Sequence, residues 1–129
     1  MNERRLLQIA VAIASLVPIA AGATGVVRGP AMVDFSMAPA AADSHYRYLS
    51  GLLLGIGCGF MTTVPAIETH SVRFRILAVI VVIGGLGRLL SLVLRGYPST
   101  PMIFGLGMEL CITPALALWQ RRIASRALQ

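Results

Sequence analysis

Residues 74–94 read FRILAVIVVIGGLGRLLSLVL, a run in which two arginines are the only charged residues. A hydrocarbon core of about 30 Å requires about 20 apolar residues in a helix, and this run has that length. Backbone N–H and C=O groups find no water in hydrocarbon, so a spanning segment must satisfy them internally. The sequence therefore predicts a transmembrane helix over residues 74–94.

Three more apolar stretches of similar length complete the pattern, at residues 6–27, 48–64 and 102–119. Charged residues make up 12% of the 129 residues, whereas a soluble domain has about a quarter. Four strands of this length could not close a barrel, so each stretch is predicted to be helical. We therefore expect an all-α membrane protein, with residues 1–129 forming a single transmembrane domain, a four-helix bundle.

The positions of the basic residues predict the orientation. All eleven are arginine, and they lie between the apolar runs rather than on one polar face, so no nucleic-acid partner is expected. Cytoplasmic loops are enriched in basic residues. A cytoplasmic N-terminus puts three arginines outside and seven inside, the inside set being Arg4, Arg5, Arg73, Arg75, Arg121, Arg122 and Arg126. We therefore expect both termini in the cytoplasm and the chain in a bacterial cytoplasmic membrane.

The first stretch has a second interpretation. Arg4 and Arg5, followed by an apolar run and small residues at 21–23, resemble a signal peptide with its cleavage site. We expect an uncleaved span, with cleavage as the alternative.

Regularly spaced glycines predict a helix-packing face. Gly51, Gly55 and Gly59 fall on one face of the second span. Gly57 on another face of that span and Gly84, Gly85 and Gly87 in the third span are further small residues of this kind. Without side chains there, a neighbouring helix backbone can approach closely, as is usual between helices in lipid. Packing within the bundle is the favoured interpretation, and contact with another subunit is the alternative.

Arg88 and Glu109 are the two charged residues expected deep inside spans. Arg88 lies seven residues before Arg95 and Glu109 seven after Met102, so both should be about 10 Å below the outer surface. A short loop joins the third and fourth spans, which should make them antiparallel neighbours. We expect an intramembrane ion pair that sets the helix register; a quinone or other polar-ligand site and ion or proton translocation are the alternatives.

A polar cluster of Asp43, His45 and Arg47 is predicted at the outer mouth of the second span. Asp43 or Ser44 could cap that helix, and Arg47 should bind a loop carboxylate or lipid phosphate. One histidine and one aspartate are too few for a metal site, and no serine or cysteine has a positioned base. The sequence predicts no metal, no cofactor and no catalytic residue.

Three motifs resemble an uncharacterised family of four-span bacterial membrane proteins, which is filed as a domain of unknown function. They are DSHYRYLSG at 43–51 with LGIG at 54–57, GGLGRLLS at 84–91, and Glu109 followed by WQRR at 119–122. The motifs are also distantly similar to DoxX-type four-helix membrane proteins, some of which are linked to quinone chemistry. A likeness at fold level does not assign an activity.

Two functions follow from these features. In the first, the chain is a non-enzymatic accessory subunit that packs against a larger cytoplasmic-membrane complex, such as one that moves lipid or envelope components. The alternative is a DoxX-like, quinone-binding redox protein that uses Arg88 and Glu109. A small dimeric transporter is the third possibility, although the first span holds no carboxylate.

Overall fold

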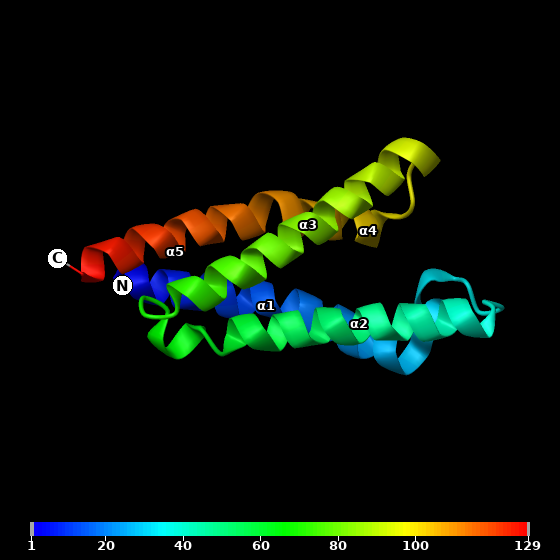
Figure 1. The fold of residues 1–129 in the computed structure, drawn as a ribbon, viewed down its shortest axis with the longest axis horizontal. Helices are drawn as coiled ribbons and strands as arrows, with labels where there is room; N and C mark the ends of the chain where they lie inside the picture. The colour runs from blue at the N-terminus through cyan, green and yellow to red at the C-terminus, as the bar shows by residue number, and fades with distance from the viewer. Residues whose placement is uncertain (1, 129) are drawn as a thin grey trace. The chain divides into compact units, whose positions relative to one another are not determined.

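Four long helices make up most of the computed structural model, which describes residues 2–128 (Figure 1). They are α1 (Glu3–Arg28), α2 (Ala40–Met61), α3 (Ser71–Arg95) and a fourth that joins α4 (Thr100–Gly107), the π-helix η3 (Met108–Ile112) and α5 (Thr113–Ala127). Two 3-10 turns, η1 (Gly29–Val33) and η2 (Val64–Ala66), lie in the connections. Each of the four is long and apolar enough to cross a membrane. The prediction of an all-α protein with four spans is confirmed.

The second helix begins earlier than the predicted span, at Ala40 rather than at residue 48. Pro39 precedes it at the N-cap position, and three alanines, the best helix formers, follow at residues 40–42. Asp43 therefore lies in the first turn, and no side chain caps the helix through a hydrogen bond. The predicted capping by Asp43 or Ser44 is wrong, because the helix starts before either residue.

The chain divides into two units, which are described separately. The first is the α1–α2 unit, Val11–Thr62, which holds most of α1 together with η1 and α2. The second is the α3–α5 unit, residues 2–10 and 63–128, which holds the first turns of α1, η2, α3 and the fourth helix.

In the α1–α2 unit the two helices run antiparallel and touch where α1 or α2 has glycine. A Cβ atom on Gly22 would lie 2.5 Å from the Leu54 backbone nitrogen, and one on Gly57 would lie 2.7 Å from Ile19 Cγ1. A Cβ on Gly25 would likewise collide with the Ser50 side chain. These distances are shorter than any ordinary packing contact, so the helix contact depends on the missing side chains.

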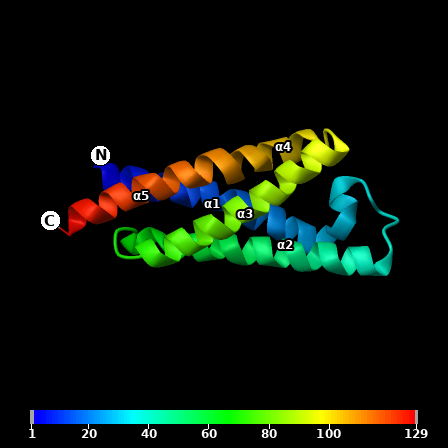
Figure 2. The ribbon, with the colours of Figure 1, turned by 45° about the horizontal axis from the view of Figure 1, so that its top comes forward.

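In the α3–α5 unit, α3 runs antiparallel to the fourth helix, an arrangement visible in both ribbon views (Figure 2). Leu7, Ile67 and Phe74 are buried almost completely. The amide of Gln120, which is only 3% exposed, donates to the Ile67 carbonyl at 2.8 Å and to Ser71 Oγ at 2.9 Å. A buried amide whose donors are satisfied in this way joins α5 to the start of α3.

The fourth helix changes its winding in the middle because of a proline. Pro114 has no N–H group and its ring would clash with the carbonyl one turn earlier in a regular α-helix. The five residues Met108–Ile112 adopt the wider π-helix instead. Thr113 then donates to the Met108 carbonyl through both its backbone N–H and, at 2.8 Å, its hydroxyl. The carbonyl is thereby satisfied inside a segment where water cannot do so.

Candidate functional site: an ion pair within the third and fourth helices

Arg88 of α3 and Glu109 of η3 face each other and form a two-point ion pair. Arg88 Nε lies 2.9 Å from Glu109 Oε2, and Arg88 Nη2 lies 3.0 Å from Glu109 Oε1. The third nitrogen, Nη1, donates to Met102 Sδ at 3.0 Å. Parallel N–H···O bonds of this kind fix the relative position of the two side chains as well as neutralising their charges. The structure thus brings together the two residues predicted to meet.

The pair is only partly covered by other protein atoms. The Arg88 side chain is 31% exposed and that of Glu109 is 15% exposed. In hydrocarbon, an isolated ion at this depth would be unfavourable, whereas a paired one needs no water. The pairing therefore explains how both charges can occupy a span.

Gly85, one of the glycines noted in the third span, and Gly105, which the sequence analysis did not select, make room for the pair. A Cβ on Gly85 would lie 2.8 Å from Glu109 Cβ, and one on Gly105 would lie 3.8 Å from Arg88 Cζ. Gly85 is three residues before Arg88, and Gly105 is four residues before Glu109, so each shares a helix face with a charged residue. This spacing of three or four residues from a charged residue is the feature of the sequence that could have indicated both glycines.

Glu109 also lies in the π-helical segment, whose wider winding follows from Pro114. Single π-helical turns inside α-helices often occur at functional sites, because they change the direction in which side chains project. Here the π-helical segment contains Glu109, the carboxylate that is paired with Arg88. The irregular winding and the ion pair are thus features of one site.

The glycines predicted to form a packing face make few contacts in the structure. Cβ atoms on Gly55, Gly84 and Gly87 would meet no heavy atom within 4 Å, and one on Gly51 would meet only Val26 Cγ2, at 3.9 Å. Gly59 is half-buried. Within the α1–α2 unit Gly55 therefore makes no such contact, and within the α3–α5 unit Gly84 and Gly87 make none, because other glycines face the neighbouring helix. Contact with another subunit stays a prediction.

In the α1–α2 unit, Arg47 and Asp43 are joined and His45 is left outside the pair. Arg47 Nε lies 2.8 Å from Asp43 Oδ2, one helical turn away. Arg47 Nη1 donates to the carbonyls of Val26 and Val27, at 2.6 and 3.0 Å. These carbonyls lie in the last turn of α1, where no helical N–H can reach them. Arg47 therefore closes the end of α1, whereas His45 lies exposed on α2.

The tight turn after α1 depends on Gly29, which has a positive φ of 59°. A Cβ there would lie 2.7 Å from Arg47 Nη2 and 2.8 Å from Asp43 Oδ1. Only glycine adopts this backbone without strain and also leaves space for the pair. Over residues 2–128, no group of three or more His, Cys, Asp or Glu residues lies close enough together to hold a metal ion.

Further ion pairs gather at the end of the α3–α5 unit where α3 begins and α5 ends. Arg4 Nε lies 2.8 Å from Glu68 Oε2, and Glu3 is paired with Arg126 at 2.6 Å and with Arg122 at 3.7 Å. The hydrogen bond from Arg4, together with one from the Glu68 backbone, lowers the pKa of the Glu68 carboxyl below its usual value. Residues 64 positions apart form the first pair, which is why the sequence did not indicate it.

Comparison with known proteins identifies a family and nothing more. A family model described as "Domain of unknown function (DUF4345)" matches residues 6–120. No curated protein and no solved structure matches the chain.

Proposed function

The chain belongs to the DUF4345 family, whose description states no activity, and we propose from its own residues that it is a non-enzymatic accessory subunit of a larger membrane complex. A system that moves lipid or envelope components is the kind of complex we propose. The observation that supports this proposal is that Arg88 and Glu109 are bonded to each other rather than open to a ligand. All three guanidinium nitrogens of Arg88 have acceptors inside the chain, and both Glu109 oxygens accept from Arg88. A pair whose nitrogen and oxygen atoms are engaged in this way fixes two helices relative to each other, which fits a structural role.

The open glycines supply the contact surface in this proposal. Gly55 of α2 has free space on its outer side, with Gly51 and Gly59 one turn away on either side. In the α3–α5 unit, Gly84 and Gly87 are open in the same sense. In lipid, a bare helix backbone of this kind favours the close approach of another helix.

The location that goes with the proposal is a bacterial cytoplasmic membrane, with both termini in the cytoplasm. Its support is the end of the α3–α5 unit where α3 begins and α5 ends, which holds seven arginines and two glutamates. Basic residues gather on the cytoplasmic side of membrane proteins. A C-terminal fusion to a reporter that is active only in the cytoplasm should therefore be active.

The test is purification of the tagged full chain in a mild detergent, followed by mass spectrometry of the proteins that accompany it. The wild type should bring a defined set of larger membrane proteins, and Gly55→Leu should lose them while melting normally. Gly107→Leu is the matched control, because Gly107 is also an open glycine but lies outside the four-residue series. Recovery of monomer or homodimer alone would refute the accessory role.

The DoxX-like, quinone-binding function requires the Arg88–Glu109 pair to open toward a ligand. In that case, added quinol should change the absorption of the purified protein, and Glu109→Gln should abolish the change. The closed geometry favours the accessory role over this alternative.

A further inference from the structure

The connection between α1 and α2, residues 29–39, exposes its large apolar side chains. Met37 is 90% exposed and Phe35 is 52% exposed, and Met32 and Val33 are exposed as well. Exposed apolar side chains that gather in one short segment mark a surface that another molecule covers. Neither the ion pair in the spans nor the proposed accessory role uses them.

The backbone of this connection is folded, so these side chains are held in place. The Phe35 N–H donates to the Pro30 carbonyl at 3.1 Å, and the Asp34 N–H donates to the Ala31 carbonyl at 3.4 Å. Asp34 has a positive φ of 60°, a conformation that aspartate tolerates better than most residues. The turn η1 lies against α2, beside its first turns (Figures 1 and 2).

The helix α1 is long enough to cross a bilayer without this connection. Its 26 residues extend about 39 Å, which is more than the hydrocarbon thickness of about 30 Å. The apolar stretch nevertheless continues through η1 and covers Glu3–Val33. Gly29, with its positive φ of 59°, ends the helical winding of α1. The apolar residues that follow therefore lie at the end of the span, and their surface continues the surface that faces lipid.

The backbone and the nearby charges place the connection at the boundary between headgroups and acyl chains. Residues 34–39 form neither helix nor strand, and such a backbone is not found exposed to hydrocarbon, because its N–H and C=O groups need water. Arg28 is exposed at the end of α1, and Arg47 is paired with Asp43 beside the last turn of α1. Charged groups of this kind belong at headgroup level.

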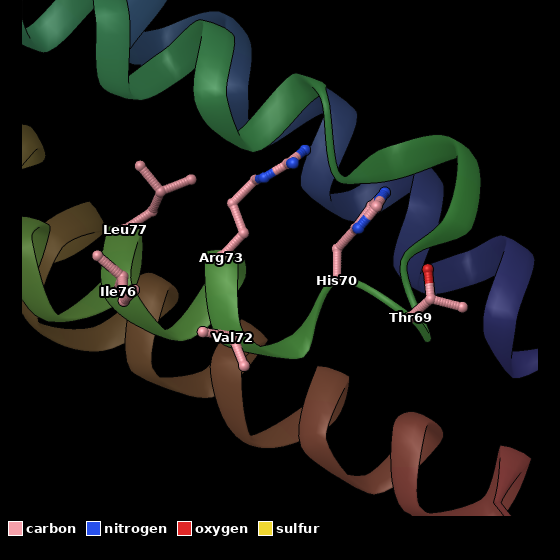
Figure 3. A pocket seen from close by; sticks show the side chains of 6 residues that line it. All are labelled: Thr69, His70, Val72, Arg73, Ile76 and Leu77. Carbon is pink, nitrogen blue, oxygen red and sulfur yellow. The ribbon is translucent and has the colours of Figure 1, made fainter.

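The connection between α2 and α3 is built differently. Ile67 is completely buried there, and its carbonyl accepts a hydrogen bond from Gln120 at 2.8 Å. Thr69, His70 and Arg73 bring polar atoms to a hollow at the start of α3 (Figure 3). A connection of this protein can thus bury a large apolar side chain, which the connection between α1 and α2 does not do for Phe35 or Met37.

From this arrangement we infer that residues 29–39 are a lipid anchor. Phe35 and Met37 insert among the acyl chains of the leaflet at that end of the α1–α2 unit, together with Met32 and Val33. Arg28 lies at the edge of the anchor, where a guanidinium group suits lipid phosphates. The partner is the lipid surface, because the exposed apolar residues continue a membrane-spanning stretch. The anchor fixes the depth of this end of the unit in the bilayer.

Tryptophan fluorescence of the full chain in phosphatidylethanolamine and phosphatidylglycerol vesicles tests this inference. Trp119→Phe removes the only tryptophan of the chain, and Phe35→Trp then places one in the anchor. Lipids brominated near the headgroup end of the acyl chain should quench its fluorescence by about half, since aromatic rings lie at this depth. Acrylamide, which is dissolved in water, should quench it about threefold less than free tryptophan.

A matched pair of carboxylates tests the role of Met37. Added to the reporter, Met37→Glu should reduce quenching by the brominated lipid about twofold, because a carboxylate is unfavourable among acyl chains. Ser36→Glu introduces the same charge one residue away, in place of a polar side chain, and should have little effect.

Three results would overturn the anchor. Strong quenching by acrylamide without quenching by the brominated lipid would place the connection in water. Protection from both quenchers would show that a second copy of the chain covers it. Equal effects of Met37→Glu and Ser36→Glu would show a general charge effect. If Phe35→Trp does not fold, Met37→Trp is the second reporter, since this side chain is 90% exposed.

Discussion

Replacing Glu109 with alanine should destabilise the contact between α3 and the fourth helix, because Arg88 loses the acceptors of two hydrogen bonds at 2.9 and 3.0 Å. Removing one partner of a fully buried pair costs about 3–5 kcal/mol. The cost here should be smaller, since Arg88 is 31% exposed and its long side chain can reach toward the membrane surface. We expect a loss of about 2 kcal/mol in the free energy of unfolding.

A double-mutant cycle measures this coupling directly. Glu109→Ala, Arg88→Ala and the double variant would be unfolded reversibly by SDS titration in mixed micelles. Each single variant should lose about 2 kcal/mol, and the double variant should lose about the same amount rather than the sum, because the second substitution removes an ion that is already unpaired. Glu109→Gln, which keeps one acceptor, should lose less than Glu109→Ala. Additive losses, with a coupling below about 0.5 kcal/mol, would refute a stabilising ion pair.

Three further predictions follow from the contacts. Gly22→Ala should destabilise the α1–α2 unit by about 1–3 kcal/mol, since its Cβ would meet backbone at 2.5 Å, whereas Gly55→Ala, in open space, should be neutral or stabilising in a melting experiment. Gln120→Leu should lower the melting temperature, because a buried carbonyl loses its donor at a cost of about 1–3 kcal/mol. The pKa of Glu68 is lowered by Arg4, so the stability from this pair is present above the unfolded-state pKa and is lost as the pH falls through the folded-state pKa. Melting from about pH 7 to about pH 3 should therefore show a smaller acid loss in Arg4→Gln than in the wild type, and equal profiles would exclude this linkage.

The ion pair could be predicted because its geometry depends on few variables. The short connection between α3 and α4 makes the two helices neighbours, and counting residues from that connection gives both side chains the same depth. The two side chains then meet if each helix is rotated about its axis so that this one residue faces the other helix. The glycine contacts could not be predicted in this way, since Gly55 and Gly57 differ by two residues and lie on different faces of α2.

The partner of Arg4 and the backbone partners of Arg47 were also outside the reach of the sequence. Arg4 finds Glu68 and Arg47 finds the end of α1, at separations of 64 and about 20 residues along the chain. No periodicity or local spacing encodes such pairs, because they form only when separate helices are placed side by side. The π-helix is an intermediate case. A proline such as Pro114 inside a helix is a local signal of irregular winding, which the sequence analysis did not use, but it does not specify which kind of winding forms.

The amino-acid sequence by itself determined that four helices form and roughly where they lie, because in hydrocarbon each helix must satisfy its own backbone whatever its neighbours are. Only the tertiary structure decided which glycines touch a neighbouring helix and which arginine closes the end of α1. Those outcomes depend on how each helix is rotated about its axis. Many weak packing contacts acting together set that rotation, and no single stretch of sequence contains them.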